Sequence, residues 1–130
     1  MKKVAVIDSG SGGVNVLKYL FKNVQGCQFL YLADDKNSPY GEKGKKQLKK
    51  IGEDLVIFLQ SFFNPDIIII ACNTLTSTAI EHLRKKFPDI VFIGCEPAIK
   101  PACKKYDQTD VLLLATPATI KHNHLIGLYQ

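Results

Sequence analysis

One segment near the middle of the chain reads Asp66-Ile67-Ile68-Ile69-Ile70-Ala71-Cys72-Asn73-Thr74. Its four consecutive isoleucines predict a strand that is buried on both faces, as at the centre of a parallel sheet. The strand ends at a thiol, an amide and a hydroxyl, shortly before a helical pattern resumes. Because ligands of open α/β sheets bind beyond the carboxyl ends of the strands, a reactive group is expected at the position of Cys72.

The Cys72 thiol is open to two interpretations. It precedes a helix, and the partial positive charge of a helix N-terminus favours the thiolate, which acts as a nucleophile or base. Most free cysteines, by contrast, are small buried hydrophobes without a chemical role. Its position does not separate the two, so the rest of the chain has to decide.

Apolar runs alternate with helical patterns along the whole chain. Strands are expected at Lys3–Ile7, Gln28–Ala33, Asp66–Cys72, Ile90–Gly94 and Asp110–Ala115. Helices are expected near Val14–Lys22, Glu42–Phe63, Thr76–Phe87, Ala98–Tyr106 and Ala118–Tyr129. This alternation predicts an α/β fold with a parallel, doubly wound sheet of the flavodoxin-like strand order and right-handed crossovers.

Length and composition indicate one domain of 130 residues, 46% of them hydrophobic. No run approaches the roughly 20 apolar residues that a membrane-spanning helix needs, so no membrane partner is expected. The apolar stretch Val4–Ile7 is too short for the core of a signal peptide. A cytoplasmic location is therefore expected.

The cysteines and histidines are spaced neither for a disulfide framework nor for a zinc finger. The absence of a Cys-x-x-Cys pair fits a reducing compartment, and no metal is expected. These residues are Cys27, Cys72, Cys95 and Cys103, with His82, His122 and His124.

The net charge of +5 comes largely from one lysine cluster, Lys43, Lys45, Lys46, Lys49 and Lys50. The cluster lies on a segment with an apolar stripe at helical spacing, which predicts the solvated face of an amphipathic helix. The stripe consists of Leu48, Ile51, Leu55, Phe58 and Phe62. Nucleic acid is not expected as a partner because no aromatic residues alternate with the lysines. A raised local potential for an anionic substrate is a further interpretation.

Polar residues follow every expected strand. Because the ends of parallel strands meet at one edge of a sheet, these loops predict a site there. The loops are Asp8–Gly13, Asp34–Gly41, Cys72–Thr74, Cys95–Pro97 and Thr116–Thr119. The first loop has two interpretations: Gly10–Gly13 binds an anion on free N–H groups, or it is a tight turn that needs glycine for its dihedrals. It is neither a dinucleotide fingerprint, because Asn15 replaces the third glycine, nor a P-loop.

Five segments at successive strand ends together resemble the glutamate racemases, a family of the cofactor-independent aspartate/glutamate racemase superfamily. The resemblance runs along nearly the whole chain. The segments are Asp8-Ser9-Gly10-Ser11-Gly12-Gly13, Ala33-Asp34, Pro39-Tyr40-Gly41-Glu42-Lys43, Ala71-Cys72-Asn73-Thr74 and Glu96-Pro97-Ala98-Ile99-Lys100.

The resemblance implies interconversion of L- and D-glutamate for peptidoglycan, without a cofactor, by two catalytic cysteines in a cleft between two α/β lobes. It implies that Cys72 is one of these two thiols and that glutamate is the partner molecule. The resemblance does not fix the assembly of the chain, and a homodimer is one assembly that is consistent with it. The implied glutamate-binding residues are Asp8, Ser9, Pro39, Tyr40, Gly41, Asn73 and Thr74.

The chemistry of racemisation fits these residue types. A proton leaves the α-carbon on one face and another arrives on the opposite face, and fixed hydrogen-bond donors must stabilise the carbanion between these steps. The hydroxyls of Ser9 and Thr74 and the amide of Asn73 are such donors. Asp8 positions either a proton or the substrate ammonium group.

The chain departs from the family pattern in its second half. The family's second thiol lies in a Gly-Cys-Thr-His segment of the other lobe, and this sequence has none. Residues 115–120 resemble the opening of that lobe, so we expect a first lobe at residues 1–106 and an incomplete second lobe at 107–130. Cys95 is a poor replacement because it would lie on the same lobe as Cys72.

Two alternatives remain open from the sequence. The chain is a non-catalytic domain of this family that binds a small molecule or a partner, or it is an unrelated flavodoxin-like domain that binds phosphate at Gly10–Gly13.

Overall fold

The computed structural model describes residues 1–105 and 110–122 of the chain. Its centre is a four-stranded sheet in which all strands are parallel, in the order β2-β1-β3-β4. The strands are β1 (Lys2–Asp8), β2 (Cys27–Ala33), β3 (Ile67–Ile70) and β4 (Val91–Gly94). The predicted α/β class, the parallel sheet and the flavodoxin-like order of these strands are confirmed.

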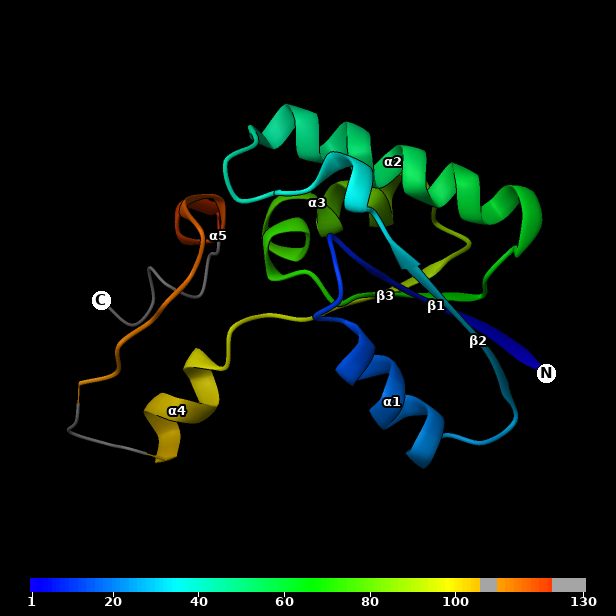
Figure 1. The fold of residues 1–130 in the computed structure, drawn as a ribbon, viewed down its shortest axis with the longest axis horizontal. Coiled ribbons are helices and arrows are strands. Elements are labelled where there is room, and N and C mark those ends of the chain that lie inside the picture. The colour runs from blue at the N-terminus through cyan, green and yellow to red at the C-terminus, as the bar shows by residue number, and fades with distance from the viewer. Residues whose placement is uncertain (106–109, 123–130) are drawn as a thin grey trace.

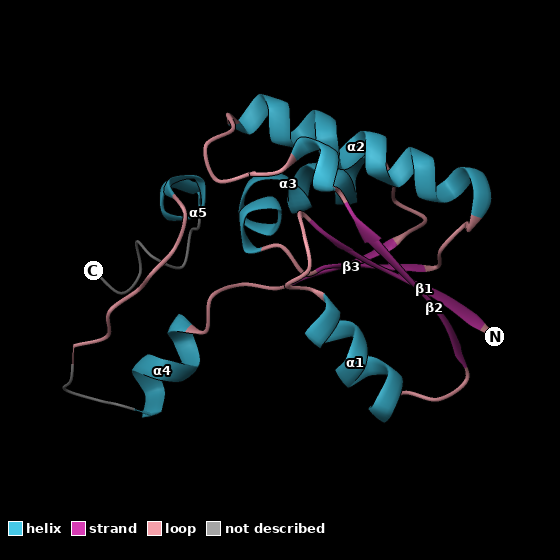
Figure 2. Ribbon diagram, viewed as in Figure 1, coloured by secondary structure: helices cyan, strands magenta, loops and turns pink. Residues whose placement is uncertain are grey.

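Helices cover both faces of the sheet (Figures 1 and 2). On one side lie α2 and α3, and α1 packs on the other. The helices are α1 (Val14–Asn23), α2 (Lys45–Phe62), α3 (Asn73–Lys86), α4 (Ile99–Lys105) and α5 (Pro117–His122), with a 3₁₀ turn at Asp35–Asn37. Within the described ranges, no helix is long and apolar enough to cross a membrane.

The isoleucine run forms β3, which pairs with β1 on one side and β4 on the other. Ile68 and Ile70 pack with the α2 and α3 side chains, whereas Ile69 belongs to the cluster under α1. Burying each of these side chains contributes about 1.5–3 kcal/mol. The prediction of a central strand buried on both faces is therefore confirmed.

The buried stripe of α2 is shifted from the predicted one near its end. Leu48, Ile51, Val56 and Leu59 are buried, but Phe58 and Phe62 are each more than half exposed. A helix that continues the 3.6-residue period from Leu48 points Leu59 toward the sheet and Phe58 away from it. The two phenylalanines contact each other instead, with ring centroids 4.9 Å apart.

The predicted strand at Asp110–Ala115 is wrong. This stretch has no regular secondary structure, and Leu112 and Leu114 are 85% and 86% exposed. An apolar run forms a strand only where a neighbouring strand completes its hydrogen bonds, and none of the described strands lies beside it. The parts of the last two predicted helices at residues 106 and 123–129 lie outside the described residues.

Candidate active site

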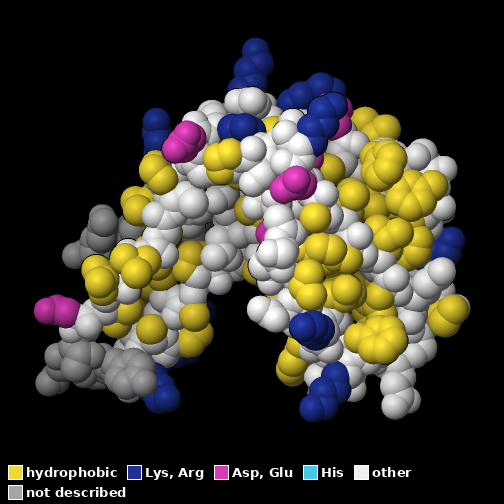
Figure 3. Space-filling view, in the orientation of Figure 1, with side chains coloured by type: hydrophobic (Ala, Val, Ile, Leu, Met, Phe, Trp, Pro, Cys, Tyr) yellow, Lys and Arg dark blue, Asp and Glu magenta, His cyan; other side chains and the backbone are white. Residues whose placement is uncertain are grey.

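A hollow of about 340 Å³ lies at the carboxyl ends of β1 and β3. Figure 3 shows the surface notched between the α1 side of the molecule and the side that carries α4 and α5. The hollow is lined by residues from the two strand ends, Asp8, Ser9, Gly12, Ala71, Cys72, Asn73 and Thr74, and from the later segment, Leu114, Ala115, Thr116 and Thr119. We refer to it below as the strand-end hollow.

Cys72 lies between β3 and α3, where it is the N-cap residue of the helix. Its backbone is extended, and its side chain makes no capping hydrogen bond to the helix. The residue is only 8% exposed and packs against the core that includes Tyr40, yet it lines the strand-end hollow. Its thiol therefore reaches both the core and the hollow, beside the positive end of the α3 dipole.

Asp8 is the last residue of β1 and is buried. Its Oδ2 accepts a hydrogen bond from the backbone N–H of Gly13 at 3.0 Å, which fixes the carboxylate against the start of α1. The hydroxyl of Tyr31 donates to the carbonyl of Gly10 at 2.6 Å. Burial, followed by the nearby charge of Asp8, raises the pKa of Tyr31.

The glycine loop serves close packing. Gly13 has no positive φ, but a β-carbon there would lie 2.8 Å from Cβ of Ala71. The glycine is needed for space, so the interpretation that dihedrals alone require it is wrong at Gly13. The loop also offers a poor phosphate cradle, since the N–H of Gly13 already binds the Asp8 carboxylate, whose charge opposes an anion.

A second buried carboxylate, Asp34, follows β2. Its Oδ2 accepts a hydrogen bond of 2.6 Å from the Tyr40 hydroxyl and one of 2.9 Å from the Asn37 side-chain amide, and its Oδ1 accepts one from the backbone N–H of Asn37. Burial, followed by the Asp34 hydrogen bond and charge, raises the pKa of Tyr40 far above its usual range. Tyr40 is thus a neutral phenol that is held in place behind Cys72.

Three threonine hydroxyls form a triangle at one wall of the strand-end hollow. Oγ1 of Thr74 lies 2.8 Å from Oγ1 of Thr116 and 3.2 Å from Oγ1 of Thr119. The third side, between Thr116 and Thr119, measures 3.0 Å. The triangle joins the first turn of α3 to α5, which packs against that helix. We call these residues the threonine triangle.

The structure brings together five of the eight residues that the sequence predicted for the site. Those five, Asp8, Ser9, Cys72, Asn73 and Thr74, line the strand-end hollow. The other three do not line it: Pro39 is exposed, Tyr40 is buried, and Gly41 abuts Thr116. A β-carbon on Gly41 would lie 2.8 Å from Cγ2 of Thr116, so this position requires glycine.

Three residues around the site were absent from the sequence-based set: Asp34, Thr116 and Thr119. All three occur in the polar loops after the expected strands, and this position is the sequence feature that could have identified them as site residues. Their roles depend on contacts with Tyr40 and Thr74.

Cys95 has a different environment from Cys72. It packs with the cluster on the α1 face of the sheet and does not line the strand-end hollow. Burial, followed by the charge of Asp8, raises the pKa of its thiol and disfavours the reactive thiolate. Cys95 is therefore not among the described residues that line the hollow with Cys72.

The hollow combines one thiol with a carboxylate, an amide and several hydroxyls, and it contains no Lys, Arg or His among its described lining residues. Such a set can exchange a proton at the thiol and bind a polar molecule through hydrogen bonds. The positive end of the α3 dipole is the local source of attraction for an anionic group.

Comparisons with known proteins agree on one family. No family model matches the chain. A glutamate racemase from Aliarcobacter butzleri is 44% identical over 119 residues, which are 92% of this chain and 46% of that protein. One from Clostridium novyi is 41% identical over 130 residues, which are 98% of this chain and 50% of that protein.

Solved structures give the same result. The glutamate racemase from Aquifex pyrophilus has a TM-score of 0.81 and 35% identity, and the match covers 92% of this chain and 47% of that one. The Francisella tularensis glutamate racemase, solved with D-glutamate, has a TM-score of 0.78 and 28% identity, over 98% and 47% of the two chains. The chain spans about half the length of the curated relatives it matches. In sequence and in fold, it is therefore a relative of the glutamate racemases and corresponds to about half of such a protein.

Proposed function

We propose that this chain forms one half of a glutamate racemase active site, in which Cys72 is one of two proton carriers. The observation that carries the proposal is the strand-end hollow, which is lined by Cys72 together with Asp8, Ser9, Asn73 and Thr74. The relative from Francisella tularensis was solved with D-glutamate, which supports glutamate as the ligand.

In this proposal the Cys72 thiolate takes the α-hydrogen of glutamate as a proton. The Cα–H bond breaks, an S–H bond forms, and the electron pair moves into the substrate carboxylate as an enolate. Hydroxyl and amide donors at Ser9, Asn73 and Thr74 stabilise the growing charge. Asp8, fixed by the N–H of Gly13, is placed to accept a hydrogen bond from the substrate ammonium group.

Three of the proposed glutamate-binding residues act from behind or beside the hollow. Tyr40 supports the Cys72 side, Gly41 allows Thr116 to approach, and Pro39 leads the chain into this turn. No cofactor takes part, because the enolate is stabilised by hydrogen bonds alone. The D-glutamate product would serve peptidoglycan synthesis, in a cytoplasmic location that fits four free cysteines.

The lobe assignment belongs to the same proposal. Residues 1–106 form the first lobe, and residues 107–130 begin a second one. The homodimer is a separate prediction that stays untested. The second proton carrier then comes from the part of a racemase that this chain does not contain, and it works on the opposite face of the substrate.

A second candidate function is glutamate binding without catalysis. It is favoured by one observation: Cys72 is the only thiol among the described residues that line the hollow. Inversion needs a proton carrier on each face of the α-carbon, and one thiol serves one face. An open second face also leaves the enolate in water, which weakens every stabilising electrostatic contact.

In the test, the chain is incubated with D-glutamate in deuterated water. NMR measures ligand binding and the loss of the α-hydrogen of glutamate, and optical rotation measures inversion. We expect binding, little or no exchange and no inversion. Any exchange should disappear in Cys72→Ser and persist in Cys95→Ser, the matched control at another strand end. Robust exchange that survives Cys72→Ser, or a chain that does not bind glutamate, would refute the proposal.

A complementation experiment separates the two candidates. The chain is mixed with the half of the Aliarcobacter butzleri racemase that it does not match. Racemisation that depends on Cys72 supports the enzyme half. Glutamate binding without racemisation in a stable complex of the two halves supports the binding domain.

A further inference from the structure

The loop that joins β1 to α1 brings Ser9 and Gly12 to the strand-end hollow. Three of its five residues, Ser9–Gly13, are glycines. Glycine has more backbone freedom than any other residue, so a loop of this composition does not hold a side chain in one place by itself. Ser9 is a preorganised hydrogen-bond donor only if contacts with other parts of the chain fix the loop.

Two hydrogen bonds fix this loop at different points. At its base, Oδ2 of Asp8 accepts a hydrogen bond from the backbone N–H of Gly13 at 3.0 Å. In its middle, the carbonyl of Gly10 accepts one from the hydroxyl of Tyr31 at 2.6 Å. Tyr31 belongs to β2, the strand that pairs with β1. The bond from Tyr31 therefore fastens the middle of the loop to the sheet.

The Tyr31 side chain combines a packing contact with this hydrogen bond. Tyr31 pairs with Val6 in the sheet, and its side chain packs in the apolar cluster under α1. Its ring abuts Gly13, where a β-carbon would lie 3.1 Å from Cε2 of Tyr31. These contacts require only an aromatic ring, which phenylalanine would also provide. The hydroxyl of a part-buried tyrosine needs a hydrogen-bond partner, and here that partner belongs to the loop.

The single proton of the Tyr31 hydroxyl decides between two acceptors. The carbonyl of Gly10 lies at 2.6 Å and Oδ2 of Asp8 at 3.5 Å, so the proton goes to Gly10. Burial, followed by the charge of Asp8, raises the pKa of Tyr31, so the phenol keeps this proton. The Asp8 carboxylate therefore remains available to a substrate ammonium group.

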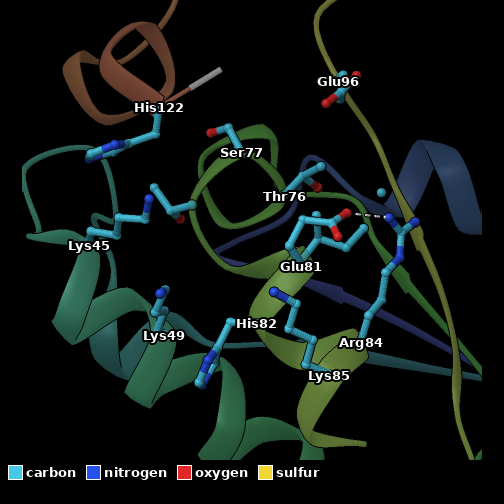
Figure 4. Close-up of a pocket in the computed structure, with 13 residues that line it drawn as sticks. Lys45, Lys49, Thr76, Ser77, Glu81, His82, Arg84, Lys85, Glu96 and His122 are labelled. Carbon is cyan, nitrogen blue, oxygen red and sulfur yellow. Dashed lines mark hydrogen bonds and ion pairs between the residues drawn. The ribbon is translucent and has the colours of Figure 1, made fainter. Parts of the chain in front are cut away.

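We propose that Tyr31 is a positioning residue for glutamate binding, whose hydroxyl anchors Gly10 and thereby holds Ser9 at the strand-end hollow. Tyr31 lines neither this hollow nor the larger cavity of about 640 Å³ beside α3 (Figure 4), so it acts on a ligand through the loop. The inference rests on the proposed function, because glutamate is the ligand that Ser9 would contact. A loop that is ordered before the ligand arrives lowers the entropy cost of binding.

The test uses Tyr31→Phe, which keeps the ring and removes the hydroxyl. In an NMR titration with D-glutamate, we expect the dissociation constant to rise about fivefold, as for the loss of one neutral hydrogen bond. Relaxation of ¹⁵N nuclei measures the order of the loop in the free chain. The N–H of Ser11 shares a peptide plane with the carbonyl of Gly10. Its order parameter should therefore fall from about 0.85 toward 0.6.

Two further variants separate the hydroxyl anchor from other effects. Tyr19→Phe removes an exposed hydroxyl from α1 and should change the dissociation constant by less than about twofold. Gly10→Ala is added to Tyr31→Phe, because a β-carbon at Gly10 meets nothing within 4 Å and the residue has no positive φ. Alanine has fewer accessible conformations than glycine, so the double variant should regain part of the loop order and of the affinity. A role of Tyr31 in packing alone predicts no such rescue.

The outcomes distinguish this inference from the proposed function. A wild-type chain that does not bind glutamate would contradict the proposed function, and the order parameter of Ser11 in the free chain would then decide whether Tyr31 anchors the loop. An unchanged order parameter in Tyr31→Phe overturns the inference. So does a wild-type chain that binds glutamate no more tightly than Tyr31→Phe, or an equal loss of affinity in Tyr19→Phe.

Discussion

The hydrogen bond between Tyr40 and Asp34 makes a quantitative prediction for the stability of the site wall. Tyr40 is 2% exposed and Asp34 8% exposed, and the bond between them measures 2.6 Å. Tyr40→Phe keeps the ring but leaves the buried carboxylate without its shortest hydrogen bond. A bond to a charged group contributes about 1.5–3 kcal/mol, so the free energy of unfolding should fall by about 2 kcal/mol. At about 2.1 cal/mol/K per residue, this corresponds to a drop of about 7 °C in Tm.

The measurement is urea unfolding followed by far-UV circular dichroism, because the chain has no tryptophan. The control is Tyr19→Phe, since Tyr19 is 69% exposed and its hydroxyl makes no hydrogen bond within the described chain. Its free energy of unfolding should change by less than about 0.5 kcal/mol. Adding Asp34→Asn completes a double-mutant cycle, in which removing the Tyr40 hydroxyl should have a smaller effect. Equal effects of the two tyrosine variants, or a coupling energy of zero, would show that this bond adds nothing to stability.

Two further predictions concern the turn beside the hollow and the contact between α2 and α3. Gly41→Ala should lower the free energy of unfolding by about 1–3 kcal/mol, measured by urea titration, because its β-carbon would lie 2.8 Å from Thr116. For Glu53, hydrogen bonds from Lys86 and then His82 lower the pKa to about 2. Its stabilisation is therefore complete above the usual pKa of 4.5 and is lost as the pH falls toward 2. Glu53→Gln should reduce this acid-dependent loss in unfolding titrations between those pH values.

Each of these changes has a matched control. Gly10→Ala places a β-carbon in open space at a residue outside the helices and without positive φ, so it should leave stability nearly unchanged. A loss equal to that of Gly41→Ala would mean that steric contact with Thr116 is not the cause. Glu81→Gln removes an exposed ion pair with Arg84, which should contribute little to the pH dependence. An unchanged acid profile in Glu53→Gln would contradict the role given to that carboxylate.

Local patterns in the sequence predicted the sheet well because the hydrophobic pattern of each strand matches the burial of that strand in the sheet. The run Ile67–Ile70 is apolar on both faces, and its place between β1 and β4 buries both. The run Val111–Leu114 has the same apolar pattern but no partner strand in the described chain, so it has no regular secondary structure, and Val111, Leu112 and Leu114 are exposed. A pattern of residues shows what a segment can bury and does not show whether a neighbour is present.

In the candidate site, too, local patterns predicted some features, and contacts between distant segments decided the others. The rule that ligands bind at strand ends placed Asp8 and Cys72 at one edge of the sheet, and both line the strand-end hollow there. The resemblance to the glutamate racemases implied that Tyr40 and Gly41 also line the site. In the structure Tyr40 is buried behind the hollow, and Gly41 is a point of close approach to Thr116. Thr119 lies 45 residues from its hydrogen-bond partner on α3, and no local pattern reports such a contact.

The threonine triangle has a consequence for the direction of its protons. Each hydroxyl donates one hydrogen bond, so a closed ring of three uses every proton internally, in either of two senses. While the ring is closed, Thr74 can only accept from a ligand. To donate to a carboxylate, Thr74 must turn its proton out of the ring, and the hydroxyls behind it then align as a chain that ends at Thr116. The N–H of Thr119 donates to Thr116 at 3.2 Å and anchors that far end. An anion in the hollow would thus orient three hydroxyls at once, and each would strengthen the next.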